Sequence, residues 1–207
     1  TIGLALCVGS IFLGSCAENT MSNWISTYME NALNIDKALG DILGMAMFAI
    51  LLGITRITYA KYGKNISKFL LISMICAALC YLTVSFSNNT ILSFVGCILT
   101  GIFTSMLWPG TLILMEEKVK GVGVAAYALM ASAGDFGASL APQLMGIVVD
   151  NISVSEFAIN MSSSLNLSPE QIGLKVGMLI TSIFPILGSI LIVFIIRFFK
   201  KENSQVK

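Results

Sequence analysis

Two acidic residues lie inside otherwise apolar stretches of the chain. Glu18 follows the run "TIGLALCVGSIFLGSCA", and Asp135 lies within "YALMASAGDFGASLAPQLMG". Because a charge in hydrocarbon is costly, such groups almost always face a bundle interior or a water-filled cavity. Two carboxylates at similar depth on different helices are typical of cation or proton coupling, or of hydrogen bonds to a polar solute. The alternative is a structural role, in which the carboxyl is protonated or caps a broken helix.

The residues after Glu18 make this segment polar on one side. Glu18 and Ser22 share a helix face at four-residue spacing, and Asn23 and Trp24 follow directly. A polar stripe with an aromatic neighbour suits a sugar or another small polar solute. Trp24 fits equally well into an aromatic belt at the membrane surface, and for Tyr28 the belt is the favoured interpretation.

Small and helix-bending residues surround Asp135. Gly134 and Gly137 allow neighbouring helices to approach closely. Pro142 removes one backbone donor and frees a carbonyl one turn earlier, so the helix can bend beside the carboxylate. This pattern predicts either a moving gate or ordinary Gly/Pro packing. Gln143 adds an amide that would face the cavity or a neighbouring helix.

The composition indicates that most of the chain is dissolved in lipid. Of 207 residues, 56% are hydrophobic and 11% are charged, whereas a soluble domain carries about 25% charged residues. A net charge of +1 without a dense basic patch argues against a nucleic-acid partner. With no histidine a mixed Cys/His metal site is impossible. The five cysteines lie in apolar runs that suit packing, so we expect no metal and no cofactor.

Six apolar runs are long enough to cross a bilayer as helices, since a span needs about 20 residues. Uninterrupted runs of this length disfavour a β-barrel, whose strands alternate over about ten residues. We therefore predict an all-α, polytopic membrane protein that forms one domain over residues 1–207. The outer loop 150–171 would carry a short surface helix that begins at Ser168 and Pro169. The chain starts without Met inside an apolar run and resembles a piece of a longer protein. The predicted spans are about 1–28, 41–60, 68–87, 90–115, 121–149 and 172–198, followed by a tail at 199–207.

The basic residues sort strongly to one side of these six spans. The other side holds only Lys37 and Lys175 of the twelve. The positive-inside rule makes the basic side cytoplasmic. We therefore expect the segment to lie in a plasma membrane with both of its termini in the cytoplasm. Arg56 is interpreted as a positive-inside anchor, and Trp108 as a packing or interface residue. The ten basic residues on the first side are Arg56, Lys61, Lys64, Lys68, Lys118, Lys120, Arg197, Lys200, Lys201 and Lys207.

These residues together resemble the C-terminal half of a major facilitator superfamily (MFS) transporter, in the branch of the fucose-permease-like bacterial sugar permeases. The resemblance rests on the six spans, on Glu18, Trp24 and Tyr28 in the first of them, and on "SMLWPGTLIL" and "AGDFGASLAPQLMG". The loop "KYGKN" is similar to a degenerate copy of the superfamily's Asp-Arg-x-Gly-Arg signature. In it Lys61, Gly63 and Lys64 take the places of the Arg, the Gly and the second Arg.

The resemblance implies a fold and a mechanism. The fold would be helices 7–12 of the bundle, built as a 3+3 inverted repeat, and a missing N-terminal half would supply the other six. The two halves would rock about a central site, so that a small solute crosses by alternating access with proton coupling. Glu18 matches a family position associated with substrate or proton handling. Asp135 has no such counterpart, and its predicted role rests on its depth, about 20 Å along its helix.

Two other classes of function compete with transport. An intramembrane aspartyl protease needs two mid-membrane aspartates on two helices, but the spans hold only Asp135. We therefore do not expect an enzyme. A membrane sensor or scaffold built on the same fold, without transport, is the remaining alternative.

Overall fold

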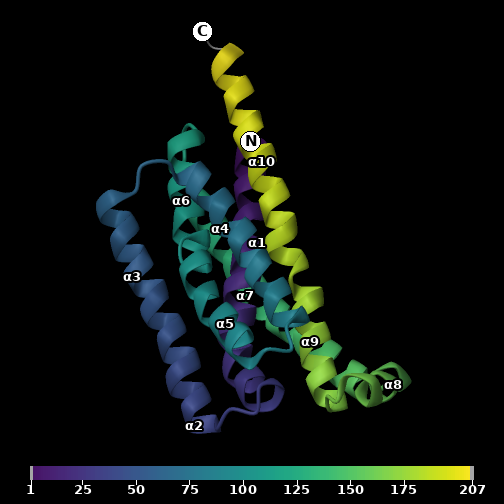
Figure 1. The fold of residues 1–207 in the computed structure, drawn as a ribbon. Coiled ribbons are helices and arrows are strands. Elements are labelled where there is room, and N and C mark those ends of the chain that lie inside the picture. Colours follow the sequence, from purple (N-terminus) through teal and green to yellow (C-terminus); the bar gives the residue numbers. More distant parts are fainter. Residues whose placement is uncertain (1, 206–207) are drawn as a thin grey trace.

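A computed structural model describes residues 2–205 of the chain, of which 203–205 are described by their backbone alone (Figure 1). Lys207, which the sequence assigned to the basic side, lies outside the described residues. The described residues form helices and connections, with no strand among them. In chain order the helices are α1 (Ile2–Thr27), η1 (Tyr28–Ala32), α2 (Lys37–Leu39), η2 (Gly40–Ala46), α3 (Met47–Tyr62), α4 (Ile66–Phe86), α5 (Thr90–Thr104), α6 (Leu107–Lys118), α7 (Val124–Ser153), α8 (Glu156–Leu165), α9 (Pro169–Thr181) and α10 (Ile183–Gln205).

Six helical runs in the described residues, two of them with a short interruption, are long and apolar enough to cross a membrane, which confirms the predicted fold class. They cover Ile2–Ala32, Lys37–Tyr62, Ile66–Phe86, Thr90–Lys118, Val124–Ser153 and Pro169–Glu202. The start of α1 and the end of α10 lie at the same end of the bundle, as an even number of spans requires (Figure 1). The α3–α4 connection and the end of α6 lie there too, and we call this the basic end.

The segment predicted as an outer loop, 150–171, is mostly helical. Helix α7 continues to Ser153, and α8 occupies Glu156–Leu165. Ser168 and Pro169 do begin a helix, but that helix is the sixth span and not a short surface helix. Ser168 caps it: its hydroxyl accepts from the Gln171 backbone, while the Gln171 side chain accepts from the Ser168 backbone. Helix α8 ends at Asn166, whose φ of 53° is tolerated by asparagine.

Prolines mark the interruptions in two spans. The fourth span breaks between α5 and α6 at Ser105 and Met106, four residues before Pro109. The sixth breaks at Ser182, shortly before Pro185. A proline has no N–H to donate to the carbonyl four residues earlier, so that carbonyl must find another partner.

Helix α1 lies at the centre and packs against α7, α10 and α6. Two buried tyrosines fasten it to α4: the Tyr28 hydroxyl donates to the Val84 carbonyl and the Tyr81 hydroxyl to the Ala17 carbonyl, both over 2.7 Å. Helix α3 lies at the periphery and packs mainly on α5 (Figure 1). Gly101 is the contact point on α5, where a side chain would meet the backbone carbonyl of Phe48.

A matched pair of glycine substitutions tests the α3–α5 contact. Gly101→Ala should lower the free energy of unfolding by about 1–3 kcal/mol, because the added methyl group must displace backbone. Gly53→Ala on α3 should be neutral or stabilising by up to about 1 kcal/mol, because nothing lies within 4 Å of the new methyl group and alanine favours the helix. Thermal unfolding of the detergent-solubilised protein measures both, and equal melting temperatures would contradict this packing.

Candidate functional site

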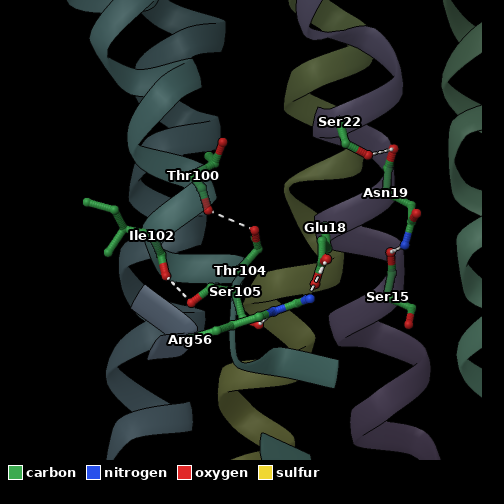
Figure 2. A network of polar contacts seen from close by, with 9 residues as sticks. All are labelled: Ser15, Glu18, Asn19, Ser22, Arg56, Thr100, Ile102, Thr104 and Ser105. Atoms are coloured by element: carbon green, nitrogen blue, oxygen red, sulfur yellow. Dashed lines mark hydrogen bonds and ion pairs between the residues drawn. The ribbon is translucent and has the colours of Figure 1, made fainter. Parts of the chain in front are cut away.

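Glu18 and Arg56 form an ion pair between the first two spans. Arg56 Nη2 lies 3.0 Å from Glu18 Oε1. The Glu18 side chain is 16% exposed and that of Arg56 is 40% exposed. The pair joins α1 to α3, which otherwise packs mainly on α5 (Figure 2). Within a bilayer such a pair lowers the cost of keeping both charges away from water.

Arg56 also holds the break in the fourth span. Its Nε donates to the Ser105 carbonyl over 2.8 Å. Pro109 stands four residues after Ser105, so this carbonyl has no backbone N–H of its own helix to accept from. The proline thus creates an acceptor and the guanidinium fills it. One side chain thereby links Glu18 of α1 to the α5–α6 break (Figure 2).

The second oxygen of Glu18 is buried and has no hydrogen-bond partner among the described residues. The hydroxyl of Ser15, one turn earlier on α1, is in the same condition. A buried acceptor without a partner costs free energy. Protonation of the carboxylate, or a hydrogen bond from a solute hydroxyl or amine, would relieve that cost.

A polar strip runs along α1 beside Glu18. We use this name for Asn19, Ser22 and Asn23. The Ser22 hydroxyl and the Asn23 amide donate back to the Asn19 carbonyl over 3.3 and 2.7 Å, and Asn23 is exposed on the surface of the chain. The strip can therefore offer two amides and one hydroxyl to a solute without breaking contacts between helices.

Trp24 in α1 and Tyr28 in η1 both donate hydrogen bonds to other spans. The Trp24 indole donates to the Pro142 carbonyl over 3.0 Å and so ties α1 to α7. Tyr28 is fully buried and bonded to α4, which corrects the interpretation of this residue as a belt tyrosine. Its hydroxyl needed an acceptor, and Val84 at the same level supplied one inside the bundle.

Asp135 lies on α7, at nearly the depth of Glu18. The adjacent Gly134 faces Ser15 and the Trp108 indole, and the Phe12 and Phe136 rings stack at 5.9 Å. Ser15 precedes Glu18 by three residues, so the two acids differ in depth by about one helical turn. Unlike Glu18, Asp135 is exposed on the surface of the chain and has no partner among the described residues. Ser132, Ser139 and Gln143 are exposed on the same helix.

Gly134 and Gly137 mediate packing in this structure. A side chain on Gly134 would collide with the Trp108 indole, and one on Gly137 would meet the Phe12 carbonyl at 2.5 Å. Helix α7 continues through Pro142 without interruption. The geometry thus accounts for both glycines through the packing of α7 on α6 and α1, and a gating role for them and for Pro142 stays a prediction.

Arg56 is the functional candidate that the sequence did not single out. Its position near the basic end suggested an anchor, but the side chain reaches back to Glu18. The signal was Pro109, which predicts a carbonyl in need of a donor, although the sequence does not say which residue supplies it. Trp108 packs where α1, α6 and α7 meet, beside Met115 and Met130, in accord with a packing role. Among the described residues no cluster of three metal-ligating side chains occurs.

The model of the Major Facilitator Superfamily matches residues 3–142, more than half of the chain. The chain belongs to the major facilitator superfamily. It is therefore a multi-pass membrane protein of a family that transports solutes and whose members are generally not enzymes. Six spanning helices are the number in one half of an MFS bundle. None of the curated proteins and none of the solved structures matches the chain. The resemblance to fucose-permease-like proteins stays a prediction.

The residues of the predicted MFS loop signature lie in the α3–α4 connection. Lys61 lies in the last turn of α3, with its ammonium 5.2 Å from the centre of the Tyr62 ring. Gly63 is the C-cap residue, with its N–H bonded to the Tyr59 carbonyl. Lys64 is exposed in the connection itself.

A double-mutant cycle tests the Glu18–Arg56 pair. Glu18→Gln, Arg56→Met and the double variant should give a coupling free energy near the low end of the usual range of about 0.5–3 kcal/mol, because Arg56 is partly exposed. Unfolding in mixed micelles supplies the free energies. The control cycle pairs Glu18→Gln with Lys61→Met, whose effects should add. Additive effects in the Glu18–Arg56 cycle would show that the contact contributes nothing.

Proposed function

We propose that the chain is the C-terminal six-helix half of a secondary active transporter that moves a small polar solute, such as a sugar, by alternating access. A second six-helix half would complete the protein in the plasma membrane, with the basic end in the cytoplasm. The solute would be moved and not converted, and no cofactor takes part. The observation that carries the proposal is Glu18, paired through one oxygen and unpartnered through the other in the middle of a span.

Three groups support a polar pathway along this half. Glu18 and the polar strip offer a carboxylate, two amides and one hydroxyl on α1. Asp135 adds a carboxylate from α7 at nearly the same depth. A charged residue on the surface of a membrane helix is unfavourable in lipid, which argues that this face lies against water or against the other half. Gln143 lies two turns further along α7 on the exposed side.

Proton coupling follows from the chemistry of Glu18. When ionised it is bonded to Arg56, and when protonated it loses that attraction and becomes a donor. A proton, a hydrogen-bond donor of the solute and Arg56 would therefore compete for the same Glu18 carboxylate. Because Arg56 also holds the α5–α6 break, a change at Glu18 would reach a second span. This arrangement offers a physical link between protonation and helix movement.

Uptake into proteoliposomes by the full-length protein tests the proposal. A panel of sugars and other small polar solutes would be offered with and without an inward proton gradient. One solute whose uptake rises with the gradient would support a proton symporter. Uptake that ignores the gradient would refute proton coupling. No uptake of any solute would favour the sensor or scaffold alternative.

Two carboxamide variants assign the acids. Asp135→Asn should abolish gradient-driven uptake in a folded protein, and Glu18→Gln should weaken solute binding or alter its pH dependence. A loss of about 1.4 kcal/mol in either step corresponds to about tenfold. Asp150→Asn on α7 and Glu30→Gln in η1 are matched controls, since these acids lie on the same two spans at the end away from the basic end. Uptake and pH profiles equal to those of the controls would make both acids structural.

A further inference from the structure

A groove opens between α3 and α4 at the basic end of the bundle. Its volume is about 420 Å³, within the range of small-molecule sites. The walls toward the middle of the membrane are apolar, with Ile54 on α3 and Ile72 on α4 both more than half exposed. Tyr59 and Phe69 also line the groove, and their rings pack against each other with centres 4.7 Å apart. The groove therefore continues the surface that faces lipid.

The mouth of the groove is cationic. Lys64 lines it, and Lys61 and Lys68 flank it at the end of α3 and the start of α4. Asn65 also lines it, but its side-chain oxygen already caps α4 by accepting from the Lys68 backbone. The lysines supply the positive charge that attracts an anion, and the Asn65 side-chain amide is a neutral donor beside them. Glu117 of α6 lies close enough to Tyr59 to interact with it electrostatically but does not line the groove, so the three lysines outnumber this acid.

We infer that this groove binds an anionic phospholipid, with an acyl chain between α3 and α4 and the phosphate at Lys64. Charge and polarity select this occupant, because the groove changes from apolar to cationic along the direction in which a phospholipid changes from acyl chain to headgroup. Lysines beside a span are attracted to anionic leaflets. Neither Glu18 nor Asp135 lines the groove, so the inference stands independently of the proposed solute.

Native mass spectrometry of the full-length protein tests the inference. Dioleoylphosphatidylglycerol should bind more tightly than dioleoylphosphatidylcholine, which has no net charge. The triple variant Lys61→Gln, Lys64→Gln, Lys68→Gln should lower the affinity for the anionic lipid by about tenfold or more. Lys118→Gln, Lys120→Gln is the matched control, since it removes two charges of the same end outside the groove. Its affinity should equal that of the unsubstituted protein.

A second pair of variants tests the acyl-chain seat. Thr58 lines the groove, so Thr58→Trp should fill it and weaken binding while all lysines remain. Leu79→Trp places the same ring on the exposed surface of α4 outside the groove and should have no effect. Equal affinity for the two lipids would overturn the inference. So would an unchanged affinity in the triple-lysine variant, or binding that survives Thr58→Trp.

Discussion

The structure depends on one guanidinium. Arg56 satisfies the carbonyl that Pro109 leaves without a backbone donor, and it also pairs with the carboxylate of Glu18. Each of the three groups alone is unfavourable in a bilayer: a free carbonyl, an unpaired cation and an unpaired anion. Together they connect α1, α3 and the α5–α6 break. The first, second and fourth spans are therefore coupled through one side chain.

The placement of this connection suits a protein that must move. Helix α3 packs mainly on α5, and the Glu18 contact is its polar link to the central helix. By contrast, the hydrogen bonds of Tyr28 and Tyr81 hold the first and third spans together without any charged group. A change in the charge of Glu18 would loosen the first connection and leave the second intact. The bundle thus contains a connection that depends on the charge of Glu18 beside others that do not.

The sequence was sufficient for the fold class because length and polarity decide it in a membrane. In lipid the backbone N–H and C=O groups of a span must form hydrogen bonds within the span itself, so a long apolar run folds as a helix whatever its neighbours are. The helix start at Ser168 and Pro169 was also predictable, because the cap depends only on the consecutive residues 168–171. The extent of that helix was not, since a capping signal gives the start of a helix and no length. Helix α8 was missed because its segment is rich in serine and asparagine.

The acids of the candidate site could be selected from the sequence, whereas the contacts that surround them could not. Glu18 and Asp135 stand out by the cost of burying charge, which the sequence alone reveals. The role of Arg56 could be predicted only if the direction of its side chain toward Glu18 was known. The role of Tyr28 depends likewise on which residue of another helix lies at its level, here Val84. Gly134 and Gly137 fitted a gate and a packing contact equally well, and the sequence did not reveal Trp108 and Phe12 as their neighbours. Contacts between spans depend on how the helices are rotated, and a single sequence does not give that rotation.

The central claim is that the face bearing the polar strip and the exposed side of α7 borders water and not lipid. Single cysteines at Asn23 and Ser139 would report on it in the full-length protein, with Cys76, the native cysteine that is not buried, replaced by serine. Cysteines at Ile50 and Ile190, exposed on α3 and α10, are the lipid-facing controls. The account predicts that a membrane-impermeant maleimide labels positions 23 and 139 and spares positions 50 and 190. Equal protection of all four positions would contradict it.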